Sequence, residues 1–209
     1  MTQYLQKTEI PEAKKGPWEI KRFTIEKSKS DFFNMQLLFD GSGDRAVEPG
    51  TYTKLINHET KTLMMSDTPA ELRDHREAIY KATGHCLIAG LGLGIIVEAC
   101  LRKPEVTKVT VLEIDKHVIK MTGDYLREQW KDKSRLEIIE CDVLQWKPPK
   151  DAKYGMAWFD IWPSISQNNW DDMKLLHRRY ARKADWKGSW GRNEIQKMNR
   201  EDREGRYYW

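Results

Sequence analysis

A glycine-rich segment, Gly90-Leu91-Gly92-Leu93-Gly94, is the strongest candidate for chemistry in this chain of 209 residues. It lies between the apolar run Cys86–Gly90 and the apolar stretch Ile95–Leu101, which together predict a strand, a tight turn and a helix. Glycines at such a turn carry no Cβ, so a ligand can approach the backbone closely. Taken alone, the pattern is equally compatible with a flexible strand-to-helix turn that binds nothing.

Acidic residues end the next two predicted strands. Glu113 closes a Val-rich strand 23 residues after Gly90, and a carboxylate there can accept both hydroxyl hydrogens of a ribose. Asp142 closes the third strand, where it could accept a hydrogen bond from an adenine amino group or simply cap a turn. The carboxyl ends of adjacent parallel strands form the usual ligand edge of an open α/β sheet. The three features together predict a nucleoside site.

The residues after the glycines favour a nucleoside cofactor without phosphates. Ile95 occupies the place of the third glycine in the dinucleotide fingerprint, and no Lys or Arg follows until Arg102. A pyrophosphate prefers a helix N-terminus, often with a basic group beside it. This pattern therefore argues against NAD as the ligand.

Asp160, at the end of the fourth predicted strand, is the candidate catalytic residue. A carboxylate beside a reactive centre can orient an amine or hydroxyl and accept its proton, although a turn-capping role is the alternative. Trp162 could stack on a planar substrate or pack in the core. His75 shares a predicted helix face with Leu72 and Ile79, which is more typical of a core histidine. No Ser-His-Asp arrangement or metal-ligand set is predicted.

The elements that must position these residues form three segments: a β-rich N-terminal extension (1–66), a Rossmann-like domain (67–183) and a polar, aromatic tail (184–209). Strands alternate with helices from residue 85 onward, which predicts a parallel sheet with right-handed crossovers. The expected fold class is α/β, with a four-stranded core. Because we expect no strand after Ala184, the sheet would be reduced at its C-terminal end.

Turn and cap signals place the upstream elements. The stretch Thr68–Glu71 has capping-box spacing and begins a helix that Gly84 is expected to end. The apolar run Phe32–Phe39 and the pair Thr51–Ile56 and Lys61–Met65 predict small antiparallel hairpins in the extension.

Composition excludes several protein classes. Apolar residues make up 39%, charged residues 33% and aromatic residues 11%, which is polar but not typical of disorder. No apolar run is long enough for a membrane span, and the first residues lack the apolar core of a secretory signal. The three cysteines are interpreted as buried, reduced thiols, so a cytoplasmic protein without membrane contact is expected.

The net charge of +4 lies in the C-terminal segment. Residues 171–209 carry 11 Lys and Arg against 7 Asp and Glu. With Tyr180, Trp186 and Trp190 interleaved, this could be a nucleic-acid surface, although a solvated helical face explains it equally simply.

At this point the chain resembles the class I S-adenosylmethionine-dependent methyltransferases, over about residues 85–183. The resemblance rests on the loop 89–94, the strand ends at Glu113 and 140–142, and the segment 158–163. Within that superfamily the chain is most similar to the spermidine synthase branch, because of the hairpin extension, the helix carrying 74–77 and the strand end 111–115.

The resemblance implies S-adenosylmethionine as the cofactor. The glycine loop would contact its amino-acid end, Glu113 its ribose and Asp142 its adenine. The implied cofactor-binding residues are Gly90, Leu91, Gly92, Gly94, Glu113, Ile114, Asp142, Val143 and Asp160, and the implied substrate-binding residues are Trp162 and His75. The expected reaction is methyl transfer to an amine or hydroxyl that Asp160 positions, in a small molecule or a nucleic acid; a homodimer is possible by resemblance.

The same resemblance leaves alternatives open. A spermidine synthase-like aminopropyltransferase would use the same pocket, but Trp162 stands where that branch has a second aspartate, and Asp74-His75-Arg76 replaces its Tyr-His-Glu. A polyamine needs several carboxylates, so these departures favour methyl transfer. The remaining alternatives are a protein that cleaves the cofactor and a non-catalytic cofactor-binding protein.

Overall fold

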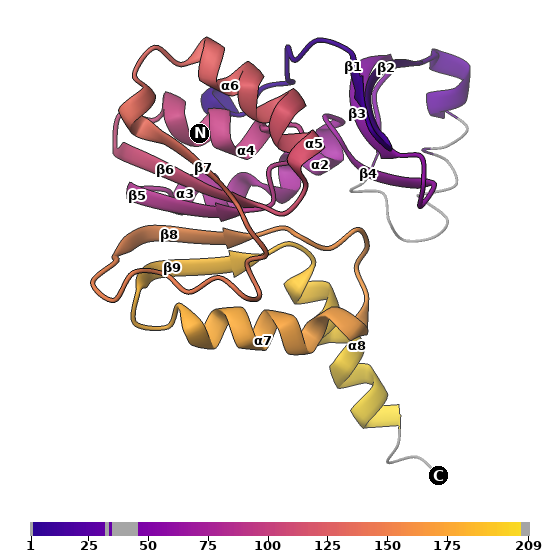
Figure 1. Cartoon of the computed structure of the whole chain (residues 1–209). Helices are drawn as coiled ribbons and strands as arrows, with labels where there is room; N and C mark the ends of the chain where they lie inside the picture. The colour runs from indigo at the N-terminus through magenta and orange to yellow at the C-terminus, as the bar shows by residue number, and fades with distance from the viewer. Residues whose placement is uncertain (1, 32–33, 35–45, 206–209) are drawn as a thin grey trace.

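The chain folds into an antiparallel sheet and a parallel sheet, which lie side by side (Figure 1). The computed structural model describes residues 2–31, 34 and 46–205. After a short 3-10 turn, η1 (Thr2–Tyr4), the N-terminal sheet has four antiparallel strands in chain order. They are β1 (Ala13–Lys15), β2 (Trp18–Ile25), β3 (Gly50–Asn57) and β4 (Thr62–Ser66).

The second sheet has five parallel strands in the order β7-β6-β5-β8-β9. The chain winds outward from β5 through β6 to β7, then returns to the other side of β5 with β8 and β9. Such a reversal leaves a crevice at the carboxyl ends of the two strands that flank it, here β5 and β8. The strands are β5 (Gly84–Ala89), β6 (Val106–Glu113), β7 (Leu136–Glu140), β8 (Tyr154–Phe159) and β9 (Ala184–Ser189).

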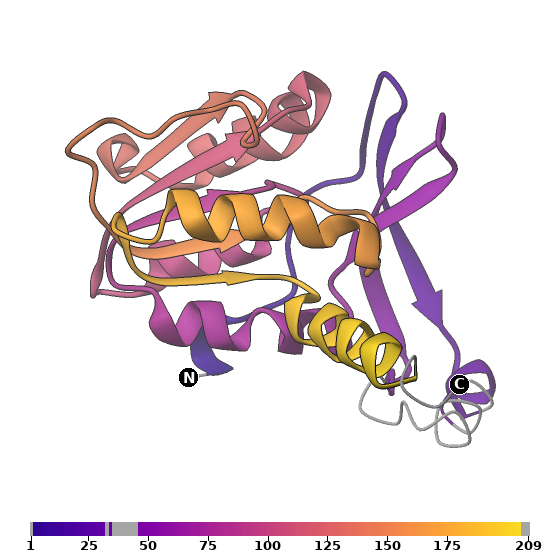
Figure 2. The ribbon, with the colours of Figure 1, turned by 90° about the horizontal axis from the view of Figure 1, so that it is seen from below.

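Helices cover both faces of this sheet, and Figure 2 shows α7 lying along one of them. The helices are α2 (Pro69–Asp74), α3 (Arg76–Lys81), α4 (Ile95–Arg102), α5 (Lys116–Val118), α6 (Asp124–Gln129), α7 (Trp170–Arg179) and α8 (Arg192–Gly205). A π-helical segment, η3 (Ile119–Gly123), joins α5 to α6, and short 3-10 turns are η4 (Lys133–Arg135) and η5 (Gln167–Asn169).

The two cores follow from the alternation of side chains along buried strands. In β5, Cys86 and Ile88 pack with α3, α4 and the inner face of the N-terminal sheet, whereas Leu87 and Ala89 pack with α7. All four side chains are fully buried. The N-terminal sheet thus shares a core with the parallel sheet, which fixes it beside the carboxyl edge.

The predicted α/β class with an N-terminal hairpin extension is confirmed. The predicted absence of a strand after Ala184 is wrong, because β9 pairs in parallel with β8 and α8 follows it. The parallel sheet therefore has five strands rather than four, because residues 184–189 add the edge strand β9. The strand escaped prediction because it is an edge strand that contains Asp185, Lys187 and Gly188, so its pairing depends on backbone bonds more than on an apolar pattern.

The upstream helix also differs from its prediction. It is two short helices that meet at His75, and it ends at Lys81 rather than beside Gly84, which begins β5. The side chain of Thr68 makes no capping bond; Glu71 instead accepts a hydrogen bond from Ser66. The predicted Phe32–Phe39 run lies outside the described residues, apart from Asn34.

Among the residues that the structure describes, no helix has the length and apolar character needed to cross a membrane. Cys86 and Cys100 are buried free thiols, as predicted, but Cys141 is only partly buried and lies at the edge of the pocket described below.

Candidate functional site

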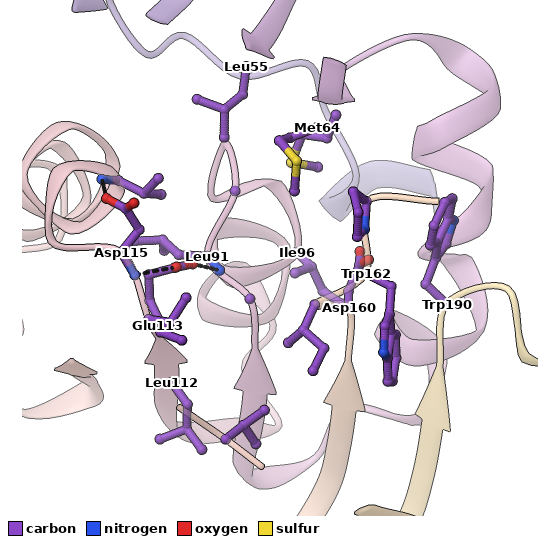
Figure 3. A pocket seen from close by; sticks show the side chains of 18 of the residues that line it. Leu55, Met64, Leu91, Ile96, Leu112, Glu113, Asp115, Asp160, Trp162 and Trp190 are labelled. Carbon is purple, nitrogen blue, oxygen red and sulfur yellow. Dashed lines mark hydrogen bonds between the residues drawn. The ribbon is translucent and has the colours of Figure 1, made fainter. Parts of the chain in front are cut away.

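A pocket of about 530 Å³ lies at the carboxyl edge of the parallel sheet, with β3 and β4 of the N-terminal sheet forming its other wall (Figure 3). Its size is in the range of small-molecule and cofactor sites. Every site residue predicted from the sequence lines this pocket except Gly94. The predicted residues that line it are Gly90, Leu91, Gly92, Glu113, Ile114, Asp142, Val143, Asp160, Trp162 and His75.

The glycine loop has little space for side chains. A Cβ at Gly90 would overlap the carbonyl oxygen of Asp160, and one at Gly92 would overlap Sδ of Met65. Both glycines have a positive φ, +93° and +50°, a conformation that other residues rarely adopt. Met65, from β4, also accepts a hydrogen bond from the amide of Leu93 at 3.0 Å. The N-terminal sheet therefore rests directly on the loop.

Gly94, unlike the other predicted site residues, is not among the residues that line the pocket. It precedes α4 as the N-cap residue, and its Cα faces Thr122 and Leu126 rather than the pocket. The structure thus gives Gly94 a packing position next to α6, where a Cβ would lie 3.1 Å from each neighbouring side chain.

Glu113 is held in place by backbone amides on both sides. Its Oε2 accepts a hydrogen bond from the amide of Leu91 at 2.8 Å, and its Oε1 accepts one from the amide of Asp115 at 2.9 Å (Figure 3). Burial raises the pKa of Glu113, while these amides oppose the shift. Each carboxylate oxygen can accept a second hydrogen bond, so the side chain can still receive the two hydroxyl groups of a ribose.

The adjoining residues supply an apolar and a polar contact. Ile114 is 67% exposed although it is a large aliphatic side chain, and it lines the pocket. Asp142 accepts a hydrogen bond from the amide of Leu144 at 2.8 Å through Oδ1, which fixes its orientation. Val143 is buried beneath it. An apolar wall beside oriented carboxylates suits a heteroaromatic ring that carries amino groups.

Asp160 lies at the switch point of the sheet, directly after β8. Its amide donates to the carbonyl of Ala89 at 2.9 Å, which ties the end of β8 to the glycine loop. Burial raises the pKa of Asp160 to about 7, and the negative charges of Glu71 and Asp74 contribute to the increase. A carboxyl group with that pKa can exchange protons near neutral pH.

Carboxylates dominate the charged groups of the pocket. Seven line it, whereas no Lys or Arg occurs among the described lining residues. They are Glu71, Asp74, Glu113, Asp115, Asp142, Asp160 and Asp172. The prediction that the chain lacks the additional carboxylates for a cationic substrate is therefore wrong: α2 brings two of them close to Asp160. The pocket attracts positively charged ligands.

Aromatic residues close the pocket next to Asp160. Figure 3 shows Trp162 and Trp190 on the same side as Asp160, opposite Glu113. Trp162 is 7% exposed, and Trp190 donates a hydrogen bond to Oδ2 of Asp74 at 3.1 Å. His75 is buried, its ring is nearly perpendicular to that of Trp158, and burial lowers its pKa to about 4. His75 is therefore neutral at physiological pH and forms part of the wall.

Sequence reasoning missed Glu71, Asp74, Asp172 and Trp190 as site residues. The sequence did offer a signal for Asp74, because this residue is next to His75, which was predicted to lie at the site. Trp190 follows β9, the strand that was not predicted, so its placement had no sequence signal.

Several basic residues near the C-terminus have structural partners. Arg179 donates to the carbonyls of Val143, Leu144 and Trp146, and Lys183 donates to those of Pro149 and Lys150. Arg179 and Lys183 therefore stabilise the segment that connects β7 to β8. Among the described residues, no group of His, Cys, Asp and Glu has an arrangement that could hold a metal ion.

Comparison with known proteins finds similarity to one kind of enzyme over part of the chain. Two polyamine aminopropyltransferases of Prochlorococcus marinus strains are each 37% identical to it, over 79 and 81 residues. The aligned parts cover 35% and 36% of this chain and 28% of each relative. The similarity expected from the sequence is thus found, but this chain matches little more than a quarter of the length of these relatives. No family model matches the chain.

Solved structures with a partly similar arrangement include two transferases. A dimethyladenosine transferase of Plasmodium falciparum is 23% identical, with a TM-score of 0.37 over 51% of this chain and 36% of that one. An N-methyltransferase of Bradyrhizobium japonicum is 14% identical, with a TM-score of 0.39 over 54% of this chain and 58% of that one.

Proposed function

We propose that this chain is an S-adenosylmethionine-dependent methyltransferase that acts on an amine. The observation that carries the proposal is the position of Asp160, a carboxyl group with a pKa of about 7, in a pocket lined by six further carboxylates and by the glycine loop. An amine acceptor is favoured over a hydroxyl because the pocket attracts cations.

The pocket residues fit the nucleoside part of the cofactor. Glu113 offers acceptor positions for the ribose hydroxyls, and the exposed Ile114 offers an apolar surface for the adenine. Asp142 is oriented by the amide of Leu144 and can accept from the adenine amino group. The bound cofactor would supply a methyl group on a positively charged sulfur. The surrounding carboxylates stabilise that charge.

Asp160 would act on the acceptor. An ammonium group has no lone pair, so it must lose a proton before nitrogen can attack carbon. The Asp160 carboxylate can take that proton near neutral pH. As the new carbon–nitrogen bond forms, the carbon–sulfur bond breaks and its electron pair returns to sulfur. Asp160 and the walls made by Trp162 and Trp190 would hold the amine in line with that bond.

A second candidate is aminopropyl transfer. It is supported by the 79-residue similarity to polyamine aminopropyltransferases and by the carboxylates that α2 contributes. The pocket lining also disfavours a cofactor that carries a carboxylate, because no described lining residue is Lys or Arg. Four of the five loop amides, all but that of Gly92, already donate within the chain.

Parallel calorimetric titrations of the full chain with S-adenosylmethionine, S-adenosylhomocysteine, decarboxylated S-adenosylmethionine and NADH separate these functions. We expect the first two to bind with comparable affinity and NADH not to bind. A clear preference for the decarboxylated compound would support aminopropyl transfer instead. Binding of NADH alone, or of none of the four, would contradict the cofactor assignment. The variant Asp160→Ala should retain cofactor binding and lose turnover.

A further inference from the structure

A second cavity, of about 330 Å³, adjoins the pocket behind Trp190. Asp74 and Trp190 line both cavities, so the two adjoin and share a wall. The second cavity is built from the ends of β8 and β9 and from the start of α8. Its charged lining differs from that of the first pocket, because Lys187 and Arg192 line it together with Asp74, Glu77 and Glu194.

Arg192 has an unused hydrogen-bond donor. Its Nη1 is buried and has no partner among the described residues, while its guanidinium lies 4.8 Å from the ring centre of Trp170. Glu77 and Glu194 also line this cavity, yet no ion pair joins either to Arg192 or Lys187 in the described part of the chain. A buried donor without an acceptor costs free energy, which an anionic ligand would recover.

The neighbouring side chains are consistent with an anion subsite. Ser189 is buried, and its Oγ lies 2.9 Å from Nε2 of His177. Burial, together with the positive charges of Arg192 and Lys187, lowers the pKa of His177 to about 4. His177 is therefore neutral, and when its Nε2 carries the proton it donates to Oγ of Ser189, which leaves the Ser189 hydroxyl hydrogen for a ligand. Two cations and a hydroxyl can together bind a carboxylate.

Strand register places this subsite close to Asp160. Phe159 pairs with Ser189, and the amide of Trp190 donates to the carbonyl of Phe159 at 3.0 Å. Asp160 and Trp190 therefore leave neighbouring strands at the same edge, about 5 Å apart. Arg192 follows two residues later. A small molecule could place its amine at Asp160 and an anionic end at Arg192.

We propose that the acceptor is an amino acid, whose amine lies at Asp160 and whose carboxylate is bound by Arg192, Lys187 and Ser189. This inference rests on the proposed function, since it places the acceptor of that reaction. It differs from a polyamine acceptor, because the far end would be an anion that accepts from the buried Nη1 of Arg192, which a second ammonium group cannot do.

The test compares amines that differ only at the far end. Glycine, β-alanine, γ-aminobutyrate and ε-aminocaproate span the possible lengths, and each is titrated calorimetrically into the full chain, with and without S-adenosylhomocysteine. Butylamine and putrescine serve as the uncharged and cationic counterparts of γ-aminobutyrate. At least one of the four amino acids should bind about tenfold more tightly than both butylamine and putrescine.

Matched variants identify the group responsible. Arg192→Gln should abolish the preference for the carboxylate, whereas Arg200→Gln, the same change at an exposed position of α8, should preserve it. Equal or tighter binding of butylamine or putrescine, or equal loss for all ligands in Arg192→Gln, would overturn the inference. So would the absence of amino-acid binding in the millimolar range. Failure of S-adenosylhomocysteine to bind would contradict the proposed function alone, because the carboxylate preference is also measured without it.

Discussion

Trp18 donates a hydrogen bond of 2.7 Å from its indole Nε1 to Oδ2 of Asp115, which joins the N-terminal sheet to the ligand edge of the parallel sheet. The other oxygen of Asp115 accepts from the amide of His117 at the start of α5. Burial acts to raise the pKa of Asp115, but the hydrogen bonds from Trp18 and from the amides of His117 and Val118 lower it overall. The amide of Asp115 in turn donates to Glu113. The extension is therefore coupled to the residue assigned to the ribose.

Replacing Trp18 by Phe should lower the free energy of unfolding, because it removes the indole donor from a charged acceptor. Trp130→Phe is the matched control, since Nε1 of Trp130 is buried without a partner among the described residues. Trp18→Phe should cost about 1–3 kcal/mol more than the control in urea denaturation. Equal costs for the two variants would mean that the bond adds no stability.

Glu113→Gln should weaken binding of S-adenosylhomocysteine at least about tenfold. Glutamine has one acceptor oxygen, so its amide nitrogen would face an N–H group, either that of Leu91 or that of Asp115. The fitting control is Glu140→Gln, which makes the same change at the residue paired with Glu113 on β7. Calorimetry on both variants measures the effect. Unchanged affinity in Glu113→Gln would exclude this carboxylate from the cofactor site.

The contact between Met65 and Gly92 should appear as non-additive stability. Gly92→Ala places a Cβ against Sδ of Met65 at a positive φ, so it should destabilise the chain by about 1 kcal/mol or more. Met65→Ala removes the obstructing sulfur but also the acceptor for the amide of Leu93.

A double-mutant cycle tests this: the free energy of unfolding is measured by urea denaturation for the wild type, the two single variants and the double variant. The double variant should be more stable than the sum of the single effects predicts, by about 0.5–3 kcal/mol. Strict additivity would show that Met65 and Gly92 do not constrain each other.

The sequence was sufficient for the central part of the fold because its signals are local. The run Cys86–Ala89 of β5 is apolar, and the glycines that follow it predict a turn whatever surrounds them. Glu113, Asp142 and Asp160 each close a strand, and parallel strands bring their carboxyl ends together. Their common location could therefore be predicted without knowledge of packing.

The remainder of the site depends on contacts between distant segments. Glu71 and Asp74 reach the pocket because α2 contacts α3, which packs against β8, and nothing in their own neighbourhood predicts that position. β9 has no alternating pattern, so Trp190 and Arg192 could not be placed from sequence. The cavity that Lys187 and Arg192 line could not be predicted for the same reason.

Asp160→Asn should stabilise the chain at neutral and alkaline pH. The pKa of Asp160 is about 7 in the folded chain against an ordinary value of 3.8. Between these values the folded state keeps a proton that the unfolded state has lost. The free energy of unfolding of the wild type therefore falls as pH rises through this interval, and the cost is complete above it. Asparagine cannot ionise, so the variant avoids the cost.

Thermal unfolding at about pH 4, 6 and 8 measures this difference. The two proteins should be similar in acid, whereas near pH 8 the variant should be more stable by about 1–4 kcal/mol, or at least several degrees in Tm. Asp185→Asn, at an exposed carboxylate of β9, controls for the loss of one negative charge. Parallel curves for Asp160→Asn and the wild type would show that Asp160 ionises without a penalty, and its assignment as the proton acceptor near neutral pH would then fail.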